Sequence, residues 1–188
     1  LWNTARSSGA PRVAGAAYME CCAEHGRGAL ADVAGLAGFV AAAEKVLAAR
    51  LQRAGLGHLV EVESAGTAGW HAGESADRRS EVALQRAGYD YGHTAAQFTA
   101  ADFERFDLVL GMDYDNVRDL RGIAPDTLLA GNVRIFRSFD PALMHLPEDD
   151  PALETPDPYY GTQADFDAVV AMVEPAADGI IDHVRLEL

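Results

Sequence analysis

The feature that most constrains the fold of this chain is a regular alternation of strand-like and helix-like segments from Ala43 onward. Short apolar runs suited to buried strands alternate with longer segments whose apolar residues recur at helical spacing. The expected strands are His58–Ser64, Asp107–Met112 and Val133–Phe136, and the expected helices are Ala43–Ala54, Arg79–Ala87, Ala101–Phe106, Asp115–Gly122 and Asp165–Glu187. Such alternation implies a parallel sheet covered by helices on both faces, so the sequence predicts the α/β class.

The first 42 residues differ from the rest of the chain. Residues 1–43 contain 13 Ala and 6 Gly and show little periodicity. This composition buries little apolar area per ordered residue and has a weak strand propensity. The best strand candidate within it is Val13–Met19. We therefore predict an atypical Ala/Gly-rich N-terminal segment over residues 1–42 and a folded domain over residues 43–188.

The charge balance and the two cysteines limit the partners and the compartment. The formal net charge is −14, and residues 1–43 are neutral overall, so the domain is strongly acidic. An acidic surface repels phosphate backbones, so nucleic acid is not an expected partner. Cys21 and Cys22 are adjacent with no third cysteine to pair with, which suits a reducing cytoplasm. Since no apolar run approaches the roughly 18 residues of a membrane span, no membrane partner is expected.

The segment Pro156–Gly161, which reads PDPYYG, is the most informative about chemistry. Its two prolines fix the backbone on either side of Asp157, and a carboxylic acid held in place can protonate a leaving oxygen. The adjacent Tyr159 and Tyr160 can wall a slot for a flat aromatic group. An ordinary acidic surface turn would have the same composition, so the residues alone leave both interpretations open.

Four segments together resemble the low-molecular-weight protein tyrosine phosphatases. They are Val62–His71 (VESAGTAGWH), His93–Gln97 (HTAAQ), Asp107–Asp113 (DLVLGMD) and Asp157–Gly161 (DPYYG). The segments follow the family's order and spacing over roughly three quarters of the chain, and such ordered matches are far more specific than any single motif. Ala96 departs from the pattern, because the family has an arginine at that position. The domain over 43–188 is identified as a member of this family by resemblance.

The resemblance implies a fold, an activity and a set of site residues. The fold would be a four-stranded parallel sheet with helices on both faces. The activity would be hydrolysis of phosphotyrosine through a phosphocysteine intermediate, without metal or cofactor, on a phosphotyrosine-containing protein or a small aryl phosphate. By motif match, the acid is Asp157, the cleft residues are Tyr159, Tyr160 and Trp70, and the residues that support the phosphate loop by hydrogen bonds are Ser64 and His93. Taken alone, the last two could be an ordinary turn serine and a surface histidine.

The family's phosphate loop is absent from its expected position. In the family it reads Cys-x-Gly-Asn-x-Cys-Arg-Ser-Pro-x-Ala-Glu and runs directly into the first helix. Counting back from the Ala43-Glu44 pair, the positions of the nucleophilic cysteine, the asparagine, the arginine and the serine fall on Val33, Leu36, Phe39 and Val40. These residues supply neither a thiolate nor a guanidinium group. The resemblance therefore predicts impaired or absent turnover in this chain.

A displaced loop is one alternative. The stretch Cys21–Arg27 satisfies Cys-x5-Arg, and Val13–Met19 could be the strand before it. Glu24 would place a negative charge where phosphate must bind, and Gly28 replaces the hydroxyl residue that follows the arginine in the family. Cys21 and Arg27 are thus the candidate nucleophile and phosphate ligand on a weak pattern.

Three explanations of the missing loop stay open. Residues 1–42 could be an out-of-frame or rearranged stretch joined to a phosphatase domain. The chain could be a pseudophosphatase that binds phosphotyrosine or another partner without turnover. It could also be a divergent enzyme that uses Cys21 and Arg27. Arsenate reductase, which shares the fold and the thiolate loop, is disfavoured because no cysteine follows Cys22 to relay the oxidation.

Overall fold

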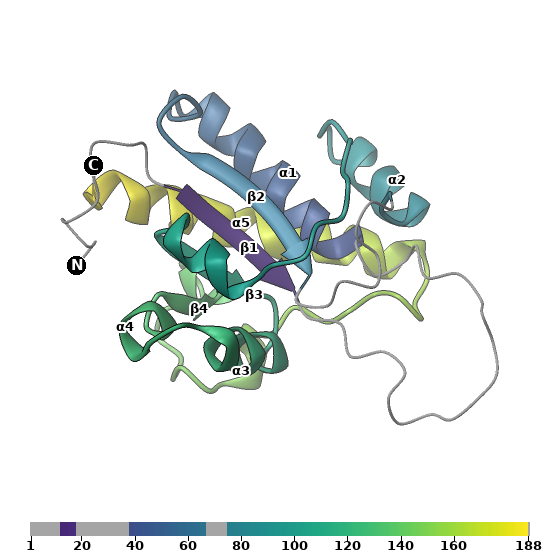
Figure 1. The fold of residues 1–188 in the computed structure, drawn as a ribbon. Helices are drawn as coiled ribbons and strands as arrows, with labels where there is room; N and C mark the ends of the chain where they lie inside the picture. The colour runs from purple at the N-terminus through teal and green to yellow at the C-terminus, as the bar shows by residue number, and fades with distance from the viewer. Residues whose placement is uncertain (1–11, 18–37, 67–74, 188) are drawn as a thin grey trace, which may run out of the picture.

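The sheet at the centre of the molecule consists of parallel strands (Figure 1). The structure is a computed structural model that describes residues 12–17, 38–66 and 75–187. The strands are β1 (Arg12–Ala17), β2 (Glu61–Gly66), β3 (Leu108–Gly111) and β4 (Val133–Ile135), in the spatial order β2-β1-β3-β4. Neighbouring strands all pair in parallel. The α/β class predicted from the sequence is confirmed.

Helices cover the two faces of this sheet (Figure 1). One face holds α1 (Gly38–Arg53), α2 (Arg78–Arg86) and α5 (Gln163–Glu187), and the other holds the 3-10 helix η2 (Ala100–Glu104) and α3 (Tyr114–Ile123). Strand β3 shows why both faces must be covered, because all four of its residues are buried. Leu108 and Leu110 join the apolar core under α1 and α5, whereas Val109 joins the core under α3. A continuous apolar run is the expected sequence of such a central parallel strand.

Strand β1 occupies the position between β2 and β3. It corresponds to the best strand candidate of the Ala/Gly-rich segment, Val13–Met19, and begins one residue earlier and ends two residues earlier. Its pairing aligns Ala17 with Gly66 of β2 and Gly15 with Leu110 of β3. The carboxyl end of β1 therefore lies at the same edge of the sheet as the carboxyl ends of β2 and β3.

Two elements begin three or more residues away from the sequence expectation. Helix α1 begins at Gly38 rather than Ala43. An alanine run shows no amphipathic contrast in the sequence, but Ala41 and Ala42 are completely buried and extend the packed face of the helix. Strand β2 begins at Glu61 rather than His58, because Leu59 N and Val60 N donate to the Leu56 carbonyl in a turn after α1. The short helix α4 (Thr127–Ala130), capped by Asp126, was missed. The short 3-10 helices η3 (Phe136–Phe139) and η4 (Pro151–Leu153) were also missed.

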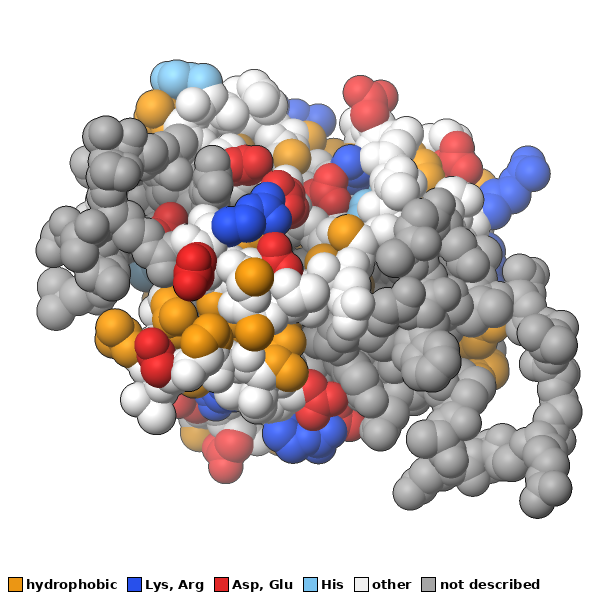
Figure 2. All heavy atoms as spheres, viewed as in Figure 1, with side chains coloured by type: hydrophobic (Ala, Val, Ile, Leu, Met, Phe, Trp, Pro, Cys, Tyr) orange, Lys and Arg blue, Asp and Glu red, His pale blue; other side chains and the backbone are white. Residues whose placement is uncertain are grey.

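The face seen in Figure 2 is mixed in charge, with a small apolar area over α4 and the neighbouring end of α3. The side chains of Leu128 and Ile123 are exposed there, and Leu128 is 67 % exposed. Among the described helices, none is long and apolar enough to cross a membrane.

Candidate active site

The candidate site lies where the strands end. In a parallel sheet all carboxyl ends meet at one edge, and ligands of α/β proteins bind there. Ser64 is near the end of β2, and Asp113 follows β3. The segment that leads to Asp157 is fixed to the same edge, because Thr155 N donates to the Met112 carbonyl at 2.8 Å. The topology thus brings segments far apart in the sequence to one edge.

Ser64, His93 and Glu44 form a hydrogen-bonded cluster beside α1. The Ser64 hydroxyl donates to Glu44 Oε2. His93 Nδ1 lies 3.4 Å from Ser64 Oγ and 3.3 Å from Glu44 Oε2, and Lys45 Nζ lies 2.7 Å from Glu44 Oε1. The His93 side chain is 5 % exposed and that of Glu44 is 15 % exposed. The structure therefore brings together the two residues expected to support a phosphate loop and adds Glu44, which sequence reasoning used only to set the register.

The charge of Glu44 is stabilised by this cluster. Burial opposes the ionised form, but hydrogen bonds from His93, Lys45 and Ser64 outweigh it and lower the pKa of Glu44 to about 2. A carboxylate whose pKa is lower in the folded than in the unfolded state stabilises the fold above the unfolded pKa. That contribution is lost as the pH falls from the unfolded value of 4.5 through the folded value of about 2.

Replacing Glu44 by glutamine is expected to remove this pH dependence. Near neutral pH the variant should be less stable by about 2–3 kcal/mol, and the difference should shrink as the pH falls from about 5 towards 2. Urea unfolding at several pH values measures both quantities. The exposed Glu148, changed to glutamine in the same way, is the matched control. A constant difference between wild type and Glu44→Gln across that pH range would contradict the electrostatic role.

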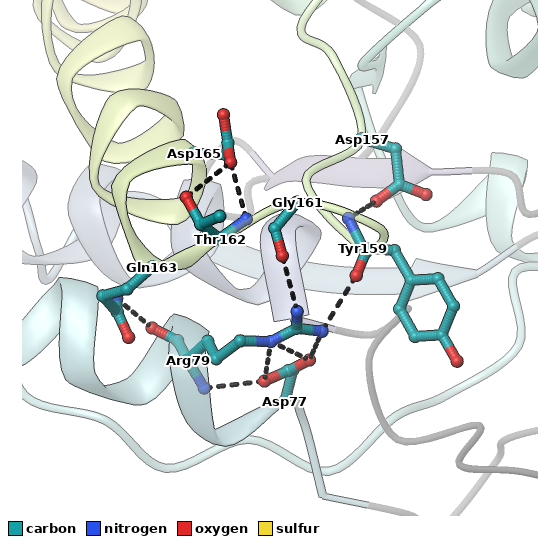
Figure 3. Close-up of polar contacts among 8 residues, drawn as sticks. All are labelled: Asp77, Arg79, Asp157, Tyr159, Gly161, Thr162, Gln163 and Asp165. Carbon is teal, nitrogen blue, oxygen red and sulfur yellow. Dashed lines mark hydrogen bonds and ion pairs between the residues drawn. The ribbon is translucent and has the colours of Figure 1, made fainter.

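The acid loop over Asp157–Gly161 is a tight turn (Figure 3). Tyr159 N donates to Asp157 Oδ1 at 2.9 Å, and Gly161 N donates to the Pro158 carbonyl at 2.8 Å. A side chain at position 161 would displace Asp165, because a Cβ atom there would lie 2.6 Å from Asp165 Oδ2 and 2.9 Å from Asp165 Cβ. Pro156 and Pro158 restrict the backbone on either side of Asp157, and the close approach of Asp165 restricts position 161.

Asp157 is exposed at the surface of this loop. Although the residue is exposed, nearby protein displaces part of the water around its carboxyl group, and this desolvation raises its pKa. The Tyr159 N–H and the positive charge of Arg79 lower the pKa in part. A carboxyl group with a raised pKa stays protonated to a higher pH. Protonation in the working range is what a general acid needs.

Arg79 joins the acid loop to the start of α2, a contact that sequence reasoning missed. Its guanidinium group donates to the Tyr159 carbonyl and the Gly161 carbonyl, each at 3.0 Å (Figure 3). The same group pairs with Asp77, the residue that caps α2, at 2.6 Å. In the sequence Arg79 is only the first residue of the expected helix Arg79–Ala87, and nothing local distinguishes it.

The two tyrosines stand edge to face. Their ring centroids are 4.7 Å apart with an interplanar angle of 75°. Tyr160 is 85 % exposed and Tyr159 is half-buried. An exposed ring beside a carboxyl group can contact a flat aromatic substrate.

Comparison with known proteins decides the family. The profile of the family "Low molecular weight phosphotyrosine protein phosphatase" matches residues 40–188. The chain belongs to this family. The low molecular weight protein-tyrosine-phosphatase of Streptomyces coelicolor is 47 % identical over 143 residues, which are 76 % of this chain and 84 % of that protein. The low molecular weight protein-tyrosine phosphatase A of Mycobacterium bovis is 40 % identical over 142 residues, 76 % of this chain and 82 % of that protein.

Solved structures of other proteins share the fold of this chain. The crystal structure of a protein tyrosine phosphatase from Entamoeba histolytica matches with a TM-score of 0.76 at 23 % identity, over 94 % of this chain and 98 % of that one. The structure of YfkJ from Bacillus subtilis matches with a TM-score of 0.75 at 21 % identity, over 97 % and 99 % of the two chains. At these identities the similarity concerns the fold.

The remaining site residues expected for this phosphatase lie outside the described residues. They are the candidate nucleophile Cys21, its partner Arg27 and the cleft residue Trp70. Within the described part, the site is strongly acidic around Asp113. Burial, together with the carboxylates of Asp115, Glu154 and Asp157, raises the pKa of Asp113 to about 6, although the Asn116 N–H opposes this. The described residues hold no group of three or more His, Cys, Asp or Glu arranged to bind a metal ion.

Proposed function

We propose that this chain is a phosphotyrosine phosphatase in which Asp157 is the general acid, and that its turnover is impaired. The observation that supports the acid role is the loop geometry: Asp157 is exposed, fixed by the Tyr159 N–H, and has a raised pKa. The exposed Tyr160 beside it fits an aromatic leaving group. Substrates would be phosphotyrosine-containing proteins or small aryl phosphates.

The proposed reaction has two steps. A cysteine thiolate attacks phosphorus, an S–P bond forms, the P–O bond to the aryl group breaks, and Asp157 gives its proton to the departing phenolate. The Asp157 carboxylate then takes a proton from a water molecule that attacks the phosphocysteine. The S–P bond breaks, and inorganic phosphate and the thiolate are released.

The impairment follows from the start of α1. In the register of the family, the arginine that clamps phosphate falls on Phe39, which is in the first turn of α1. A phenylalanine side chain has no N–H group to donate to phosphate. The nucleophile position falls on Val33, which has no thiol. We therefore expect slower turnover than in relatives that retain the Cys-x5-Arg loop.

Residual activity would come from Cys21, with Arg27 as the phosphate ligand. Strand β1 supports this part of the proposal, because its carboxyl end at Ala17 is aligned with Gly66 at the candidate site. Cys21 is four positions further along the chain. Residues 18–37 also connect β1 to α1, which is the connection that forms the phosphate loop in the family.

The test is hydrolysis of p-nitrophenyl phosphate at mildly acidic pH by the purified chain and by two cysteine variants. We expect slow release of phosphate that is abolished in Cys21→Ser and retained in Cys22→Ser, since the neighbouring thiol is a matched control. Comparable rates in both variants would remove Cys21 from the nucleophile role. Absence of activity in the unmodified chain would contradict the hydrolase proposal.

A phosphotyrosine-binding protein without turnover is the second candidate. The missing thiol at Val33 favours it, because a site without a nucleophile cannot turn substrate over. The intact acid loop does not favour it, because binding needs no general acid. Calorimetric titration with a phosphotyrosine peptide separates the two candidates. Binding without phosphate release would support the second one.

A further inference from the structure

One arginine holds two peptide groups of the acid loop. Arg79 Nη2 donates to the Tyr159 carbonyl and Nη1 donates to the Gly161 carbonyl (Figure 3). We propose that Arg79 is a positioning residue for Asp157, which fixes the carboxyl group by holding the main chain of the loop. This inference rests on the proposed function, because it assigns a second residue to the acid step.

The peptide groups of Tyr159 connect the arginine to the acid. The Tyr159 N–H donates to Asp157 Oδ1 at 2.9 Å, and the Tyr159 carbonyl accepts from Arg79 at 3.0 Å. A displacement of Tyr159 would therefore move the donor that orients the carboxylate. Arg79 thus acts on Asp157 through Tyr159, and also through its positive charge, which favours the ionised form of the carboxyl group.

Arg79 is itself held rigidly. Asp77 accepts from its Nε at 3.1–3.2 Å and from its Nη2 at 2.6 Å, and the Asp77 side chain is only 10 % exposed. The guanidinium group also lies over the Phe166 ring of α5, 4.5 Å from the centroid. A planar fork fixed on one side by a carboxylate can present its other N–H groups in a defined direction. Arg79 thus connects α2, α5 and the acid loop in a fixed orientation.

The entry to the acid loop is fixed independently of Arg79. Arg137 Nη1 donates to the Glu154 carbonyl at 2.8 Å, and Thr155 N donates to the Met112 carbonyl at 2.8 Å. Loss of Arg79 should therefore release the exit of the loop, residues 159–161, and leave residues 154 and 155 in place. That local effect distinguishes positioning from a general loss of stability.

The test compares Arg79→Gln with Arg86→Gln. Arg86 is also on α2, but its ion pair is with Asp167 of α5, at 2.9 Å, rather than with the acid loop. In Arg79→Gln we expect phenyl phosphate hydrolysis to fall about tenfold or more, because small misplacements of catalytic groups cost this much. Hydrolysis of p-nitrophenyl phosphate, whose leaving group needs little protonation, should fall much less. Arg86→Gln should leave the ratio of the two rates unchanged.

Two further measurements complete the test. Arg79→Lys should give an intermediate ratio, because an ammonium group can donate to a carbonyl but cannot reproduce the planar fork. Amide hydrogen exchange should accelerate at residues 159–161 in Arg79→Gln and not in Arg86→Gln. If the unmodified chain releases no phosphate, the proposed function fails. Hydrogen exchange alone then tests whether Arg79 holds residues 159–161 in place. Unchanged exchange at residues 159–161, or an equal loss on both substrates, would overturn the inference.

Discussion

Asp157→Ala is expected to slow the hydrolysis of phenyl phosphate by a factor of about 100 to 10,000, the usual contribution of a general acid. The loss on p-nitrophenyl phosphate should be far smaller, because p-nitrophenolate is a weak base and departs without a proton. The pH dependence provides a second criterion. The acid must be protonated, so the phenyl phosphate rate should fall as the pH rises through the raised pKa of Asp157. Asp157→Ala should abolish that fall.

Steady-state rates on both substrates from about pH 4 to pH 8 check these expectations. The exposed Asp149 of the preceding loop, changed to alanine, is the matched control and should leave the rate ratio unchanged. An equal loss on the two substrates in Asp157→Ala would show that the carboxyl group does not protonate the leaving group.

Gly179→Ala is expected to destabilise the fold by about 3 kcal/mol, although alanine is the better helix former. Gly179 is in α5, and a Cβ atom there would lie 1.7 Å from the Phe139 carbonyl oxygen and 2.8 Å from the Phe139 carbonyl carbon. The overlap is with backbone atoms of η3, which cannot rotate away. Overpacking of this kind costs about 1–3 kcal/mol or more, and the helix-propensity gain of about 1 kcal/mol does not offset it. Against a total stability of about 5–15 kcal/mol, this loss is large.

Urea unfolding of Gly179→Ala beside Gly122→Ala measures the effect. Gly122 is in α3 and is exposed, and a Cβ atom added there would meet no neighbouring atom within 4 Å. Its replacement by alanine should therefore stabilise the protein by up to about 1 kcal/mol. Equal changes in the two variants would mean that α5 and η3 do not approach as closely as the structure shows.

The sequence predicted the parts of the molecule that depend on local pattern. The α/β class and the acid loop follow from apolar periodicity and from two prolines around one carboxylate. The role of Arg79 could not be predicted, because its acceptors are main-chain carbonyls 80 and 82 positions away, and a carbonyl has no sequence signature. The cluster around Glu44 was only partly predictable. Ser64 and His93 came from the motif, but Glu44 is 20 and 49 positions from them.

Strand β1 shows a different limit of sequence reasoning. The run RVAGAA has little intrinsic strand preference. It nonetheless forms a strand paired on both sides, with β2 along its whole length and with β3 over Val13–Gly15. Pairing with two neighbours decides the conformation where propensity is weak. Such tertiary contacts cannot be predicted from a window of sequence.

The way in which Arg79 holds the acid loop would separate the proposed acid geometry of this chain from its substrate preference. The arginine contacts the carbonyl oxygens of Tyr159 and Gly161, and every amino acid has such an oxygen. The Tyr160 side chain lies between these two anchors in the sequence and is 85 % exposed. A different side chain at position 160 would therefore reshape the surface that we propose meets the substrate and leave the anchored backbone unchanged. In the proposed mechanism, selection can change the substrate preference at position 160 without altering the geometry of proton donation.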